Sequence, residues 1–215
     1  MLDVVEIEKM FLREDGTYAF ARWGRPISPV VFGVSDETLA LVKRAIETVC
    51  LACGHATDEI DPELGSNFMM FFFCDWAELL EVPDLDQMIP ELNSVVGRLQ
   101  VAGSNQYRAF RFDDEGGIQA CFVFLRMDKD LEQVGADRLA LAQAIKAILL
   151  WSTEAFRTIS PLVTLDNGTT IVRPDIAVLL RAAYDPVMPV ATQDPSHALR
   201  LSARMVKALS PTDLR

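Results

Sequence analysis

Histidine is scarce in this chain, whose 215 residues include only His55 and His197. The zinc-binding motif H-E-x-x-H needs two histidines one helical turn apart, and these two lie far apart. The sequence also contains no G-x-S-x-G, no P-loop and no G-x-G-x-x-G. It therefore lacks the complete motifs that accompany serine hydrolases and nucleotide-binding enzymes. We expect no cofactor, and the absence of a complete motif favours a function other than catalysis.

Positive charge is also in short supply. The chain has 20 lysines and arginines against 31 aspartates and glutamates, a formal net charge of −11, and no run of basic residues. A negative protein repels phosphate backbones and anionic lipid surfaces. We therefore expect no nucleic-acid partner.

Long apolar runs are missing as well. The longest tract, residues 139–151, is interrupted by Gln143 and Lys146 and is too short to cross a bilayer. The first residues lack the basic start and apolar stretch of a secretory signal. The sequence predicts a soluble, cytoplasmic protein with no membrane span, and removal of a leader would change that prediction to export.

Four cysteines are too few, for this length, to form the dense framework of a small disulfide-rich domain. We expect reduced, buried thiols at these positions, which are Cys50, Cys53, Cys74 and Cys121. Cys50 and Cys53 form a C-x-x-C followed closely by His55. Their place at the end of a predicted helix, where the dipole disfavours a thiolate, favours structural cysteines. The alternative is a thiol- or zinc-dependent module at Cys50, Cys53 and His55, with Cys74 and Cys121 as further soft ligands. Exposure of the two sulfurs in a cleft would support that module, and full burial would argue against it.

What the chain does have is a large apolar content, half of its residues, which is enough for the core of one domain over residues 1–215. Apolar periodicity and turn residues predict strands at 17–23, 29–34, 67–74, 107–112, 118–127 and 169–172. They predict helices at 3–12, 36–53, 75–81, 90–99, 136–156, 174–184 and 196–209. The fold class is therefore α+β, with a mixed sheet, an edge hairpin around residues 113–117, a long buried central helix and C-terminal helices.

Two acidic clusters are predicted to be solvated surface rather than cation sites. They are the hairpin tip Asp113, Asp114 and Glu115, and the loop residues Asp58, Glu59, Asp61 and Glu63. His197, in the first turn of the last predicted helix, is also expected to be solvated. Three tryptophans, Trp23, Trp76 and Trp151, are expected at the edge of the core.

The C-terminal part carries a resemblance to a known family. Residues 176–186, IAVLLRAAYDP, resemble an L-L-R-x-L-Y-D-P signature. Arg22-Trp23 with Pro26 resembles the opening of the same family's first strand pair, which continues at 29–34, and Asn67-Phe68 fits its next strand. The chain thus resembles, over residues 22–186, the alphaproteobacterial family called domain of unknown function 2927.

The resemblance implies a zincin-like fold, with a mixed sheet, an edge hairpin and a central helix that carries an E-E-L-x-Q-x-L-G-L segment. That segment falls on residues 142–150, where Ala142 and Gln143 stand in place of the paired acids. Zincin chemistry also needs two histidines and a glutamate, and the segment 142–150 contains none of the three. The resemblance therefore implies a degenerate scaffold without the metal-binding motif.

The leading hypothesis is a non-catalytic binding or assembly domain with a protein or small-molecule partner. A hydrolase-type enzyme with a carboxylate site is the alternative, and Glu154 and Asp175 are its candidate members. A homodimer is also possible, through an apolar stripe of the last helix formed by Leu199, Met205, Val206 and Leu209.

Overall fold

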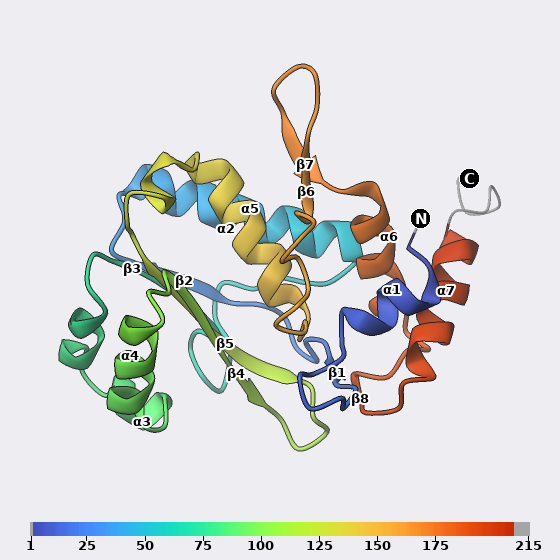
Figure 1. The fold of residues 1–215 in the computed structure, drawn as a ribbon, viewed down its shortest axis with the longest axis horizontal. Helices are drawn as coiled ribbons and strands as arrows, with labels where there is room; N and C mark the ends of the chain where they lie inside the picture. The colour runs from blue at the N-terminus through green and yellow to red at the C-terminus, as the bar shows by residue number, and fades with distance from the viewer. Residues whose placement is uncertain (1, 209–215) are drawn as a thin grey trace.

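The computed structural model, whose described residues are 2–208, is built around a four-stranded mixed sheet (Figure 1). The strand order is β2 (Pro29–Phe32), β3 (Phe68–Phe73), β5 (Ile118–Arg126) and β4 (Gln106–Phe112). β3 runs parallel to β2 and to β5, and β4 lies antiparallel to β5 at one edge. The α+β class, the mixed sheet and the edge hairpin predicted from the sequence are confirmed.

Helices lie on both faces of this sheet. Buried residues of α2 (Asp36–Cys53) and α5 (Ala136–Ile148) pack together in one apolar cluster, which also contains Met70 of β3. The other cluster contains Phe71 together with residues of η1 (Trp76–Glu81), α3 (Leu85–Met88) and α4 (Leu92–Val101). Neighbouring residues of β3 thus point into different clusters, because side chains alternate along a strand. This explains why the sequence of β3, FMMFFF, is apolar at every position.

The bounds of α2 follow from its ends. The hydroxyl of Ser35 accepts a hydrogen bond from the Thr38 amide, which caps the first turn. Gly54 ends the helix in the left-handed region, at φ 75°, where a residue without a Cβ has no steric penalty. Both signals are visible in the sequence, and the predicted helix is confirmed.

The remaining elements form a second group beside the sheet. α1 (Val4–Lys9) and α6 (Pro174–Ala183) both pack against α7 (His197–Ala208). β1 (Phe20–Ala21) pairs with β8 (Ala191–Thr192), and β6 (Leu162–Thr164) forms a hairpin with β7 (Thr170–Val172) that projects from the molecule (Figure 1). A short turn, η2 (Leu131–Gln133), precedes α5. Leu209, included in the last predicted helix, lies outside the described residues.

The predicted strand at 17–23 is wrong in length, since β1 has two residues. Its flanking residues pair singly with three separate segments instead of one neighbouring strand. Isolated bridges join Tyr18 to Leu12, Arg22 to Leu149 and Trp23 to Ile118.

The predicted end of the central helix, at residue 156, is also wrong, because α5 ends at Ile148. Three aromatic side chains satisfy the carbonyls of its last turn. Trp151 donates to the Ile145 carbonyl, Trp23 to that of Ala147 and Tyr184 to that of Ile148. With these acceptors occupied the chain turns away, and residues 149–159 become available to line the cleft described next.

None of the helices within residues 2–208 is both long and apolar enough to cross a membrane.

Candidate functional site

A cleft of about 670 Å³ lies where three separate segments meet. It is lined by residues of α1 and the turn after it, by residues 154–159 beyond the end of α5, and by Arg173 and Asp175 at the start of α6. Its size falls within the range of small-molecule sites, roughly 300 to 1,000 Å³.

The apolar part of the lining is anchored in the core. It consists of Leu2, Met10, Leu12, Ala155, Phe156 and Ile159. The ring of Phe156 lies 4.9 Å from that of Trp151, which in turn stacks on Phe11 at 5.3 Å. Phe156 has a φ of 67°, which is unusual and costly for an aromatic residue. The surrounding contacts hold it there, and such strain is typical of residues at binding sites.

The charged part of the lining is balanced in sign. Four basic residues, Lys9, Arg13, Arg157 and Arg173, stand against four acids, Glu6, Glu14, Glu154 and Asp175. Two ion pairs account for half of them. An Arg157 nitrogen lies 2.6 Å from a Glu154 oxygen, and Arg173 donates two hydrogen bonds to Asp175, one of them 2.8 Å long.

The structure thus brings together Glu154 and Asp175, the two carboxylates that the sequence offers as candidates for catalysis. The hydrogen bond from Arg173 is the main cause that lowers the pKa of Asp175. A general acid at neutral pH needs the opposite shift. Asp175 is therefore suited to an ion pair and to binding, not to proton donation.

Two cations of the cleft remain without an ion-pair partner among residues 2–208, namely Lys9 and Arg13. Of the acids without an ion pair, Glu6 accepts the Asp3 amide in the capping box of α1 and Glu14 accepts the Thr153 hydroxyl. The acids are thus committed to the protein, while the two cations are available to a ligand.

The C-x-x-C motif lies inside the core. Cys50 and Cys53 are buried, and burial raises the pKa of their thiols to about 12 and about 11. Nε2 of His55 lies 2.9 Å from the Arg25 carbonyl oxygen, and burial lowers the pKa of His55 to about 4. Residues 2–208 contain no group of three or more His, Cys, Asp or Glu side chains placed to hold a metal ion. This burial is the arrangement expected of structural cysteines, and the thiol or zinc module stays an untested prediction.

The other two cysteines differ from each other. Cys121 is buried as expected, whereas Cys74 is exposed, which corrects the expectation of a buried thiol. β3 ends at Phe73, so Cys74 falls just outside the sheet.

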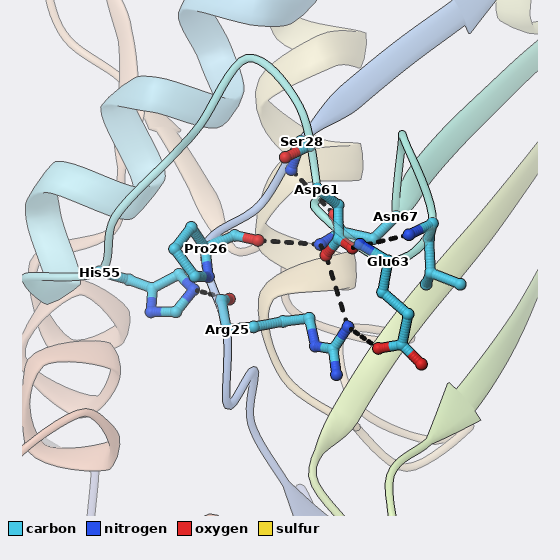
Figure 2. Close-up of polar contacts among 8 residues, drawn as sticks. Arg25, Pro26, Ser28, His55, Asp61, Glu63 and Asn67 are labelled. Atoms are coloured by element: carbon cyan, nitrogen blue, oxygen red, sulfur yellow. Dashed lines mark hydrogen bonds and ion pairs between the residues drawn. The ribbon is translucent and has the colours of Figure 1, made fainter.

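The loop between α2 and β3 contains a buried acid, and the expectation that all four of its acids are solvated is wrong for Asp61. Figure 2 shows this polar cluster. Asp61 is 4% exposed and accepts hydrogen bonds from the amides of Glu63 and Leu64 and from the Asn67 side chain, at 2.8 to 2.9 Å. A guanidinium nitrogen of Arg25 lies 3.5 Å away.

Asn67 completes the cluster by joining this loop to the segment before β2. It donates to the Pro26 carbonyl and accepts from the Ser28 amide, both at 2.8 Å. Burial alone would raise the pKa of Asp61, but its hydrogen bonds and the Arg25 charge lower it. Through Asn67, Asp61 ties the loop between α2 and β3 to the segment before β2, and we call this cluster the clasp.

The remaining candidates divide between one confirmed prediction and one correction. Asp114 and Glu115 are exposed at the hairpin tip, and Asp113 accepts the amides of Glu115 and Gly117, which shapes the turn. His197, by contrast, is 1% exposed, because the first turn of α7 packs against Phe20, whose ring lies 4.2 Å away.

On α5, the positions that the family resemblance assigns to paired acids carry Ala142 and Gln143. Gln143 is buried and bonded to two residues of β4. Its Oε1 accepts from Arg108 at 2.7 Å and its Nε2 donates to Gln106 at 2.9 Å. The sequence analysis did not identify Arg108 as a candidate site residue. The signal that could have identified it is a charged residue within a predicted strand, between apolar residues.

Comparison of the chain with protein-family models, curated proteins and solved structures gave no match. The resemblance noted from the sequence motifs stays a prediction.

Proposed function

We propose that this chain is a non-catalytic binding domain whose ligand occupies the cleft between α1, residues 154–159 and the start of α6. One observation carries the proposal. The cleft combines an apolar floor with two cations that have no ion-pair partner within residues 2–208, while Glu154 and Asp175 are held in ion pairs. Such a lining binds and orients a ligand without supplying a proton donor.

The lining also indicates a ligand class, an organic anion with an apolar body. Phe156 and Ile159 offer the apolar contact, and Lys9 and Arg13 offer charge-assisted hydrogen bonds to an anionic group. The other two cations of the lining, Arg157 and Arg173, are already paired with Glu154 and Asp175, so we expect the ligand to carry a single anionic group.

A degenerate zincin-like scaffold is part of this proposal. It is supported by the antiparallel edge pair β4 and β5, by the helix α5 that follows it, and by the absence of H-E-x-x-H on α5. It remains an analogy of fold, which by itself carries no function.

The test uses 8-anilinonaphthalene-1-sulfonate, a fluorescent organic anion with an apolar body, in titrations followed by fluorescence and by amide NMR shifts. We expect shifts at α1, residues 154–159 and 173–175. Ile159→Asp and Arg13→Gln should each weaken binding by about tenfold, given the usual contributions of an aliphatic side chain that a ligand covers and of a charged hydrogen bond.

Matched controls are Val101→Asp, since Val101 is 92% exposed at the end of α4, and Arg138→Gln, since Arg138 is exposed on α5. Both should bind the dye as the parent does. Equal affinity of all four variants, or shifts confined to other segments, would remove the cleft as the site.

The second candidate function is a hydrolase with a carboxylate site, and the observation that favours it is the presence of Glu154 and Asp175 in one cleft. The test is hydrolysis of nitrophenyl esters and glycosides by the purified chain. Activity that Glu154→Gln abolishes, while dye affinity is unchanged, would establish the enzyme and displace the non-catalytic proposal.

Assembly through the last helix is the remaining part of the proposal. Met205 is buried in the core, so the predicted stripe does not form one surface, although Leu199 is 60% exposed. Light scattering during size-exclusion chromatography tests this role. A dimer that Leu199→Asp converts to a monomer would support assembly, and a monomeric parent would refute it.

A further inference from the structure

Two cations lie where the edge strand β4 passes α5. Arg108 lies on β4, on the same face as Gln106, and Lys146 lies on α5 one turn after Gln143. The side chains of Arg108 and Lys146 are both only partly accessible. Gln143 contacts Arg108, and Lys146 lies on the same side of α5 as Gln143, because residues three apart in a helix are neighbours.

The position of Arg108 is fixed by the amide of Gln143. Oε1 of Gln143 accepts from Nη1 of Arg108, and Nε2 donates to Oε1 of Gln106. The amide cannot turn over without losing both hydrogen bonds. The guanidinium is therefore held through Nη1, and this is the one side-chain hydrogen bond that Arg108 makes within residues 2–208.

Neither cation has a counter-charge among residues 2–208. In the described part of the chain, Arg108 and Lys146 form no ion pair, and the ammonium group of Lys146 donates no hydrogen bond. The titratable groups around them are the two cations themselves and the buried thiol of Cys121 on β5, whose pKa is raised to about 12. Burial and the Arg108 charge together lower the pKa of Lys146 to about 8.

This arrangement is unfavourable for the free protein. Two like charges, drawn partly out of water, repel each other and are normally paired with acids. The chain has 31 acidic residues, yet none of those described faces this pair. A group whose charge balance is incomplete in the protein alone is a candidate for completion by a ligand.

We propose that Arg108 and Lys146 form a binding site for an oxyanion, a carboxylate or phosphate group of a small ligand, oriented by the Gln143 amide. The planar guanidinium can donate to two oxygens of such a group, and the ammonium donates a further hydrogen bond to one of its oxygens. The site lies on β4 and α5, away from the residues that line the cleft, so it does not depend on the function proposed above.

The first test needs no variant. The Cε and Hε NMR signals of Lys146 are followed from pH 6 to pH 11 in chloride, then in inorganic phosphate and in malonate at the same ionic strength. In chloride Lys146 should titrate near 8. Phosphate, malonate or both should raise its pKa, and which of the two acts distinguishes a phosphate from a carboxylate ligand. An unchanged pKa in both would refute the proposal.

Variants locate the effect. Lys146→Met keeps the apolar stem of the side chain, and Arg108→Lys keeps the charge but loses the fork. Each should weaken binding of the effective anion, measured by calorimetry, by about tenfold. Arg138→Gln, an exposed cation on the same helix, is the control and should bind normally. Equal affinity in all three variants means an adventitious ion only, and refutes the site.

The dye titration of the cleft keeps this proposal separate from the proposed function. Lys146→Met should bind the dye like the parent. A parent protein that binds the anion but not the dye would refute the cleft as a binding site and would leave the oxyanion site supported.

Discussion

The hydroxyl of Tyr18 lies 2.9 Å from Nδ1 of His197, which is 179 residues further along the chain. This contact joins the segment before β1 to the first turn of α7. The other ring nitrogen of His197, Nε2, is buried without a hydrogen-bond partner in residues 2–208. The environment therefore accommodates a neutral imidazole and offers nothing to a second ring proton.

The first prediction concerns acid stability. Burial is the main cause that lowers the pKa of His197 from 6.5 to about 4. Because the folded pKa is the lower one, this stabilising contribution is complete above pH 6.5 and is lost as the pH falls toward 4. Between pH 7 and pH 5 the free energy of unfolding should fall by about 2 kcal/mol through this residue. Urea unfolding at each pH measures the change.

The control for this prediction is the second histidine. His55 has a pKa lowered to about 4 by burial and should add a similar loss over the same pH range. His197→Gln and His55→Gln should each reduce the pH dependence, and the double variant should reduce it further. An unaltered slope in His197→Gln would show that His197 binds as many protons in the folded as in the unfolded state, so that its pKa is not lowered.

The second prediction concerns the clasp at Asp61. Asp61→Ala should lower the free energy of unfolding by about 3 kcal/mol, because it leaves the amides of Glu63 and Leu64 and the Asn67 side chain without their acceptor. Asp58→Ala removes an exposed acid of the same loop and should change it by less than about 0.5 kcal/mol. Equal effects of the two changes in urea unfolding would refute the assignment of Asp61 as the clasp.

The third prediction concerns thiol reactivity. Since the thiolate is the reactive form, Cys50, Cys53 and Cys121, with pKa values raised by burial, should resist a disulfide reagent such as dithionitrobenzoate in the native protein. Cys74 is exposed and should react at once. One fast thiol is expected, which Cys74→Ser removes, and four in urea. Rapid reaction of Cys50 or Cys53 would instead support the hypothesis of a thiol-dependent module at these residues.

Much of the fold was predictable because local signals decide it. Ser35 and Gly54 mark the ends of α2, and the apolar run before Cys74 marks a strand buried on both faces. The end of α5 was not predictable. Ile148 is followed by residues that continue the apolar pattern, and the helix stops there because Trp23 and Tyr184, distant in sequence, bind its last carbonyls.

The candidate sites divide in the same way. Glu154 and Asp175 could be named from residue type, but their meeting in one cleft depends on the packing of α1 and α6. The burial of Asp61 and His197 went unpredicted because a polar residue in a loop or a first turn is usually solvated. The pairing of Arg108 with Lys146 needs strand and helix placed together, which no periodicity in one segment conveys.

The fourth prediction concerns the end of α5, where Tyr184 donates to the Ile148 carbonyl and accepts from the Trp23 amide. Tyr184→Phe keeps the ring but leaves both groups unpaired in the core, so the free energy of unfolding should fall by about 1 to 3 kcal/mol. Tyr107→Phe is the matched control, because its hydroxyl makes no hydrogen bond with residues 2–208, and it should change stability by less than about 0.5 kcal/mol. Because residues 154–159 follow this helix end, Tyr184→Phe should also weaken dye binding in the cleft. A loss of stability with unchanged dye affinity would show that the cleft keeps its shape independently of how α5 ends.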